Sequence, residues 1–226
     1  QRMLQSTTLL DLALETIERW SQIKSARNGE TRIGYRHGYL GNTSYDDAHS
    51  QTDHRHVDAE RILLDAIEAA IYDHAQKHSD WWQKNRERLC FNHEGALCYF
   101  AVLALTNSPA PNLDLIGRLL CDKNLLEFEL SFELCTLIQS AFIYLDSATQ
   151  DAVMVVIQTV WEGPTTEEGA RFWILKKRAE YISAIPCHLR SGEAQAILDA
   201  YEKIYGTLIR QPSIGMRGGW VAAPFS

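Results

Sequence analysis

The sequence contains few of the residues that characterise fibrous, low-complexity or disulfide-linked proteins. Only 13 of its 226 residues are Gly, 6 are Pro and 5 are Cys, a composition that excludes collagen-like and intrinsically disordered classes. The cysteines are odd in number, form no C-x-x-C pair and lie in apolar stretches, so we predict reduced core thiols in a reducing, cytoplasmic compartment. They are Cys90, Cys98, Cys121, Cys135 and Cys187.

Long apolar runs and an excess of positive charge are also absent. The longest uncharged apolar run, around Ala152 to Trp161, is much shorter than the roughly 18 residues that cross a bilayer, so no membrane partner is expected. Because 22 Lys and Arg stand against 29 Asp and Glu, the formal net charge is -7, which does not favour nucleic acid as a partner. No leader segment precedes Leu9, and we expect the chain to be a piece of a longer polypeptide.

Apolar side chains recur at spacings of three and four residues along most of the chain, which is the pattern of amphipathic helices. No run alternates apolar and polar residues between hairpin turns, so no strand is predicted and the fold class is all-α. Trp20 and Ile62 belong to the apolar faces, and Asn112 and Asp146 are predicted helix caps. Helices are expected over residues 8–24, 57–78, 92–106, 113–121, 124–143, 148–161, 166–185 and 192–208.

We expect residues 1–211 to form one α-helical repeat-like domain with a long polar loop at 25–56, followed by an extended tail at 212–226. From residue 92 onward the helices alternate in pairs about forty residues apart, near the period of HEAT and armadillo repeats. Several helices are apolar on more than one face, as in a layer between two neighbours. These features predict antiparallel helix pairs stacked as an irregular HEAT-, armadillo- or TPR-like solenoid, with a compact helical bundle as the alternative.

No nucleotide-binding or hydrolase motif is present in the sequence. It lacks G-x-x-x-x-G-K-[ST], G-x-G-x-x-G, G-x-S-x-G and H-E-x-x-H, so we expect no enzymatic activity and no cofactor in this chain. His and Asp residues over 46–58 are of the types that bind divalent metals, but their spacing fits no metal-site signature. We favour a polar loop that caps the following helix. The alternative is a metal-dependent hydrolase with candidate ligands His49, Asp53, His54 and His56.

Three smaller features are interpreted as structural. His74 and His78 would share a helix face, but the segment between them lacks the Glu that a zinc hydrolase uses as its base, which favours a solvated helix end. Glu94 suits the positive end of a helix dipole. Cys90 and Cys98 are interpreted as core thiols, because no matched base accompanies either.

Aromatic residues near arginine are the candidate partner contacts. Adjacent tryptophans on a helix point about 100° apart, so one of Trp81 and Trp82 could be exposed and could act with Arg86 at a partner surface. Packing between helix layers is the favoured interpretation for this pair, and the partner surface is the alternative. The long loop has a similar composition, and we weigh partner recognition there against a slightly favoured loop that folds over its own helices. The loop candidates are Tyr35, Arg36, His37, Tyr39 and Tyr45.

Two segments resemble a known family. Residues Leu125 to Gln158, in which the turn 144–150 joins two helices, resemble the helical-repeat region of large bacterial STAND-type, NLR-like anti-phage NTPases. The ending 218–224 is similar to a Gly-Trp-Val-Gly-Pro segment of the same proteins, although Ala222 and Ala223 stand where Gly-Pro is expected. The resemblance implies a repeat region that recognises a phage protein and drives oligomerisation. Because nucleotide motifs are missing, this chain could match only that region.

The combined expectation is a non-catalytic, protein-binding helical-repeat segment that serves as a sensor or scaffold in an anti-phage NTPase. Its partner would be a protein, which the resemblance implies is a phage protein, and a second copy of the chain is the other partner considered. The alternatives are the metal-dependent hydrolase and an oligomerisation module.

Overall fold

The computed structural model describes residues 6–27, 34–49, 59–162 and 168–209, and all regular secondary structure in these ranges is helical. The all-α prediction is therefore confirmed for the described residues. The bounds are α2 Thr7–Arg27, α3 Ser44–His49, α4 Ala59–Gln76, α5 Asp80–Cys90, α6 Gly95–Asn107, α7 Leu113–Leu120, α8 Lys123–Leu126, α9 Ser131–Ala141, α10 Ser147–Thr159, α11 Glu168–Ala184 and α12 Gly192–Tyr205, with the 3₁₀ turns η1 Leu40–Asn42, η2 Ala110–Asn112, η3 Phe142–Tyr144 and η4 Cys187–Leu189.

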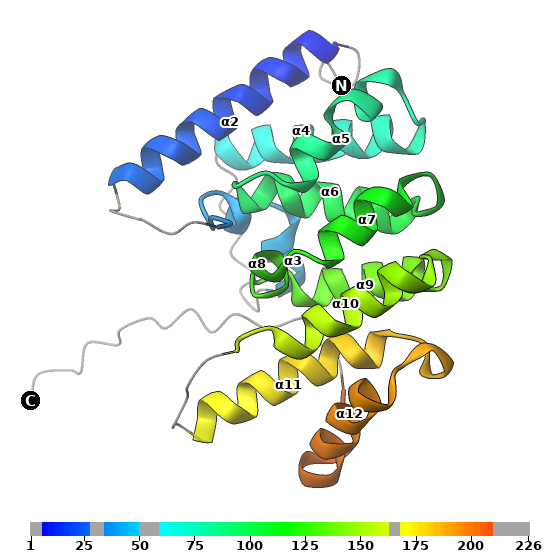
Figure 1. Ribbon diagram of the computed structural model, residues 1–226. Helices are drawn as coiled ribbons and strands as arrows, with labels where there is room; N and C mark the ends of the chain where they lie inside the picture. The colour runs from blue at the N-terminus through cyan, green and yellow to red at the C-terminus, as the bar shows by residue number, and fades with distance from the viewer. Residues whose placement is uncertain (1–5, 28–33, 50–58, 163–167, 210–226) are drawn as a thin grey trace, which may run out of the picture.

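The helices follow one another along a stack that has α2 at one end and α12 at the other (Figure 1). In one row α4 packs on α6, α6 on α9, α9 on α11 and α11 on α12. Beside it, α5, α7 and α10 contact α6, α9 and α11 respectively. A cluster of buried apolar side chains extends through the stack from Leu10 to Tyr201. No helix of the described part is long and apolar enough to cross a membrane.

Helix α6 lies in the middle of the stack and is apolar around its whole circumference. Ten of its 13 residues are buried, as a helix enclosed on several sides requires. Its thiol Cys98 is fully buried and lies 3.3 Å from the Cys90 carbonyl oxygen. Burial raises the pKa of both Cys90 and Cys98, so these two residues are core thiols.

The hydrophobicity pattern of the sequence did not predict helix α5, because the buried side of this helix is partly polar. The buried side chains at helical spacing are Trp82, Asn85 and Leu89, and the Asn85 amide donates to the Trp81 carbonyl at 3.0 Å. Ser79 caps the helix by accepting from the Trp82 backbone N–H. A hydrogen-bonded Asn in place of an apolar side chain thus hides the period from a hydrophobicity pattern.

The predicted helix at 124–143 is wrong, because the chain forms two helices there. Asp122 caps α8 by accepting from the N–H groups of Asn124 and Leu125, and α8 ends at Leu126 before α9 begins at Ser131. Between them Phe128 turns toward the segment after α2, where it packs against Tyr35. The local sequence has a helical pattern, but the helix is interrupted where Phe128 contacts Tyr35 in a distant part of the chain.

Other local predictions have mixed outcomes. Asp146 caps α10 as predicted, whereas Asn112 occupies the cap position of α7 without a side-chain cap bond. Trp20 and Ile62, which were assigned to apolar core faces, are exposed. Cys187 is exposed, so its assignment to the core is wrong.

The ends of the first predicted loop and of α4 also differ from expectation. Residues 25–27 continue α2, and the loop contains η1 and α3, so 25–56 is not one irregular connection. His78 lies beyond the end of α4 with φ 47, so it does not share a helix face with His74. The predicted tail at 212–226 lies outside the described residues.

Candidate protein-binding surface

The segment 34–46 lies against the junction of α5 and α6 and forms, together with Phe128 and Glu129, a surface that we call the loop platform. Two backbone hydrogen bonds attach it to the start of α6. The Arg36 N–H donates to the His93 carbonyl at 2.7 Å, and the Gly95 N–H donates to the Arg36 carbonyl at 2.8 Å. This bridge joins residues that are far apart in the sequence.

Glu94 anchors the loop platform from inside the protein. The residue is fully buried, and its Oε1 accepts from the Tyr39 N–H at 2.8 Å and from the Ala96 N–H at 3.3 Å. Glu94 is therefore the cap of α6 and also an acceptor for the loop.

The electrostatic environment of Glu94 disfavours its charged form. Burial raises the pKa of Glu94, although the Ser21 hydroxyl, the N–H groups of Tyr39 and Ala96 and the charge of Arg36 act in the opposite direction. Gly38 makes this close contact possible, because a Cβ atom there would lie 2.3 Å from Glu94 Oε2. The loop can approach the carboxyl group only where its backbone carries no side chain.

Tyr39, a predicted partner contact, faces the protein interior and is 5% exposed. The Lys24 ammonium lies 4.6 Å from the centre of its ring and donates to the Gly38 carbonyl at 2.7 Å. The prediction that Tyr39 contacts a partner is therefore wrong. The residue fixes the loop to α2 and α6 because its backbone and ring are both engaged.

In the outer part of the platform, two predicted contacts, Tyr35 and His37, meet two residues that the sequence did not suggest, the exposed Glu129 and the buried Phe128. The rings of Tyr35 and His37 lie 5.7 Å and 4.6 Å from that of Phe128, measured between centroids. His37 Nδ1 lies 3.2 Å from Glu129 Oε2, and the His37 side chain is 51% exposed. An aromatic surface with a charged edge results.

Two tyrosine hydroxyl groups attach this face to the rest of the protein. The Tyr35 hydroxyl donates to Asp122 Oδ2 at 2.8 Å, and burial is the largest of the effects that raise the pKa of Tyr35. Tyr45 packs edge to face on Tyr99 at 5.6 Å and donates to the Glu129 carbonyl at 3.3 Å. The loop is thus folded over its own helices and still presents half-buried aromatic groups.

Ser44 connects α3 to the helices beneath it. Its hydroxyl donates to Glu68 Oε1 at 2.6 Å and lies 3.0 Å from the Tyr99 hydroxyl. Burial raises the pKa of Glu68 against the opposing effect of Ser44. The platform therefore has a second polar attachment on α4 and α6.

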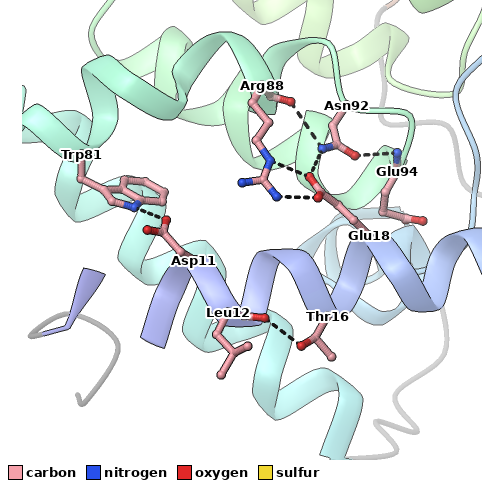
Figure 2. Close-up of polar contacts among 8 residues, drawn as sticks. All are labelled: Asp11, Leu12, Thr16, Glu18, Trp81, Arg88, Asn92 and Glu94. Carbon is pink, nitrogen blue, oxygen red and sulfur yellow. Dashed lines mark hydrogen bonds and ion pairs between the residues drawn. The ribbon is translucent and has the colours of Figure 1, made fainter. Parts of the chain in front are cut away.

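Trp81 and Trp82 are both buried, so the interpretation that one of them is exposed at a partner surface is wrong, and packing between helices is observed. The Trp81 indole N–H donates to Asp11 Oδ1 at 2.7 Å, which fastens α2 to α5 (Figure 2). Arg86 donates to Asn112 Oδ1 at 2.8 Å and to the Pro111 carbonyl at 3.2 Å. Arg86 therefore joins α5 to the turn before α7.

A chain of hydrogen bonds connects α2 to Glu94 (Figure 2). Glu18 accepts from Arg88 at 2.5 Å and from the Asn92 amide at 2.7 Å, and Asn92 Oδ1 accepts from the Glu94 N–H at 2.9 Å. The charge of Glu18 also raises the pKa of Arg88 through this hydrogen bond. α2 and the anchor of the platform consequently share one hydrogen-bond network.

A separate groove lies between α7 and α10, with a volume of about 670 Å³. Its apolar lining includes Leu113, Leu145 and Ala152, and Arg118 and Asp146 stand in its wall. Tyr144 at its edge is 62% exposed. This groove contains no predicted contact residue, but its size suits one or two side chains of a bound peptide.

The predicted metal cluster falls mostly outside the described residues. His49 ends α3, and Asp53, His54 and His56 are not described. Within the described ranges, no three or more His, Cys, Asp or Glu residues are grouped so that they could hold a metal ion.

Comparisons with known proteins found no matching family model, no matching curated protein and no matching solved structure.

Proposed function

We propose that this chain is a non-catalytic protein-binding segment whose partner contacts lie on the loop platform. The contact residues are Tyr35, Arg36, His37, Tyr45 and Glu129. The observation that carries the proposal is the combination of a fully buried anchor, Glu94, with an outer aromatic face on which the His37 side chain is 51% exposed. Contacts within the chain hold the segment in place, and its outer side chains are of types that contact protein partners.

The physical advantage of such a surface is a low entropic loss on binding. Ordering a mobile side chain on association costs about 0.5–1.5 kcal/mol. Tyr35 and Tyr45 already have fixed hydroxyl groups, so less freedom remains to be lost. Tyrosine and arginine are also frequent among the residues that dominate interface energies.

We further propose that the stack is a solenoid of helix pairs. Helices α5 and α6, α7 and α9, and α10 and α11 are the pairs, and packing of α6 on α9 and of α9 on α11 supports their succession. Such an arrangement gives a rigid frame with surface loops that can vary independently of the core.

The parent protein that we propose is a cytoplasmic, bacterial STAND-type anti-phage NTPase in which this chain is part of the sensor or scaffold. The support is the resemblance of residues 125–158, which span the end of α8, all of α9 and most of α10. In that role the partner would be a phage protein.

The test is affinity capture from phage-infected and uninfected bacterial lysates with the full chain as bait, followed by mass spectrometry. One phage protein enriched only after infection is the expected result. Capture of host proteins alone would contradict the sensor role and support a scaffold role. Capture of only further copies of the chain would support the oligomerisation module.

Surface variants then locate the contact. We expect His37→Ala and Glu129→Ala to weaken binding of the captured protein at least about tenfold, as for residues central to an interface. Val155→Ala, on the exposed side of α10 at 59% exposure, is the matched control and should bind normally. If only Tyr144→Ala weakens binding, the contact lies in the groove between α7 and α10 and the platform assignment is wrong.

A further inference from the structure

Helix α2 has two apolar stripes, and only one of them faces the other helices. Leu10, Leu14 and Ile17 are fully buried, whereas Leu9, Leu12, Trp20 and Ile23 are between 38% and 59% exposed. With 3.6 residues per turn, these four residues and Thr16 fall within about 40° of one direction. Figure 2 shows Leu12 and Thr16 on the side of α2 away from Asp11 and Glu18, which face α5.

The exposed stripe is symmetric about Thr16. Leu9 and Ile23 each lie seven residues from it, and Leu12 and Trp20 each lie four residues from it. An antiparallel copy of the same helix, related by a two-fold axis at Thr16, would therefore place Leu9 opposite Ile23 and Leu12 opposite Trp20. A two-fold interface requires this kind of self-complementary surface.

We propose that a second copy of this chain covers the stripe, with the two α2 helices antiparallel and Thr16 on the two-fold axis. A small side chain at the axis lets the helices approach to the usual 8–10 Å between their axes. The Thr16 hydroxyl already donates to the Leu12 carbonyl at 2.7 Å (Figure 2), so pairing would bury no unpaired donor.

Charge along one flank of the stripe fits the same arrangement. Glu15 and Arg19 are exposed and lie on the same side of the stripe, about 100° and 60° from Thr16 around the helix. In the antiparallel pair, Arg19 of one copy comes within about 3 Å of Glu15 of the other along the axis, given a rise of 1.5 Å per residue. Two equivalent Glu–Arg contacts then form on one flank of the antiparallel pair, whereas a parallel two-fold pair would put these residues of the two copies on opposite flanks.

The proposal is independent of the function proposed for the loop platform, which uses other residues. Because a single helix supplies the apolar contact, the interface is small and the dimer should be of the weak, reversible class. Concentration-dependent association is therefore the expected behaviour.

The first experiment is analytical ultracentrifugation of the full chain over a concentration series. Wild type should show a monomer–dimer equilibrium, and Leu12→Asp should weaken it at least about tenfold, because a charge would be buried in the stripe. Val155→Asp is the control, since Val155 and Leu12 are equally exposed at 59%. A monomeric wild type, a dimer unaffected by Leu12→Asp, or a dimer equally disrupted by Val155→Asp would each overturn the proposal.

The second experiment tests the two-fold axis. Thr16→Cys in a Cys187→Ser background, which removes the exposed native thiol, should give a disulfide-linked dimer on mild oxidation because each thiol meets its own copy. Gln22→Cys, exposed on another side of α2, should not. Equal crosslinking of both variants, or crosslinking only through Gln22→Cys, would contradict the antiparallel geometry.

Charge exchange distinguishes intermolecular contacts from effects within one helix. We expect Glu15→Arg and Arg19→Glu each to weaken the dimer about two- to tenfold, and an equimolar mixture of the two variants to recover it as a heterodimer. No recovery in the mixture would contradict the Glu15–Arg19 contact. Leu12→Asp should still bind the partner of the loop platform, so failure of one proposal does not imply failure of the other.

Discussion

Glu94 joins two distant parts of the chain through one buried carboxyl group. Its Oε1 accepts N–H groups from Tyr39 in the loop and from Ala96 in α6. Glu94→Ala removes both acceptors and leaves the donors buried, so we expect the free energy of unfolding to fall by about 2–4 kcal/mol. Urea unfolding measures this change, and a loss below about 0.5 kcal/mol would show that the anchor is unimportant.

Glu94→Gln keeps the acceptor and removes the charge. Because burial raises the pKa of Glu94 above its unfolded value of 4.5, the folded protein holds a proton that the unfolded chain releases. The stability contributed by this group therefore falls as pH rises through the folded-state pKa. We expect the stability of Glu94→Gln relative to wild type to increase from pH 4.5 toward neutrality, as measured by urea unfolding at several pH values. A difference that is constant with pH would contradict this account.

Residue roles were predictable where they depend on neighbours in the sequence. The Asp146 cap follows from its position before a helix, whereas Glu94 was interpreted only as a dipole partner. Its role depends on Tyr39, which is 55 residues away. Whether Trp82 is buried or exposed could not be predicted for the same reason. Its hydrophobicity makes it a candidate for burial, but the local sequence does not show which helices surround it.

Helices α7 and α10 approach closely at Gly117. A Cβ atom there would lie 2.7 Å from Thr149 Cγ2, and the Thr149 hydroxyl is held by Asp146, so the methyl group cannot turn away without losing that bond. Gly117→Ala should therefore introduce strain that offsets the better helix propensity of alanine.

A double-mutant cycle isolates this contact. Thr149→Ser removes the methyl group and retains the hydroxyl, so Gly117→Ala should be more favourable by about 1 kcal/mol in the Thr149→Ser background than in wild type. The measurement is the free energy of unfolding of the four proteins. Additive effects would mean that the two helices separate without cost.

At the scale of elements, periodicity predicted most helices and misplaced those whose pattern is interrupted by tertiary contacts. It missed α5, whose buried row includes Asn85, and it joined α8 to α9 across Phe128. The described ranges contain no strand, as expected. Both apolar stripes of α2 have helical spacing, so the sequence pattern grouped the exposed Trp20 with the buried Leu10, Leu14 and Ile17.

For the molecule as a whole, the stack and the loop platform are connected by polar groups as well as by apolar packing. Glu18, Arg88 and Asn92 link α2 to the residue before α6 (Figure 2), and Glu94 continues the link to Tyr39. The sequence could predict an all-α chain whose long loop contains aromatic residues of the types common in protein interfaces. It could not predict which aromatic groups face outward, because the buried anchor determines their orientation.

The central claim is that the loop platform is formed before any partner binds. Hydrogen exchange of the full chain tests it most directly at the Tyr39 N–H, which Glu94 holds. We predict exchange at least about a hundredfold slower than in an unstructured chain, equivalent to about 2.7 kcal/mol of opening free energy, and selective loss of this protection in Glu94→Ala. Exchange of residues 34–46 at the unstructured rate in the wild type would contradict a preformed platform.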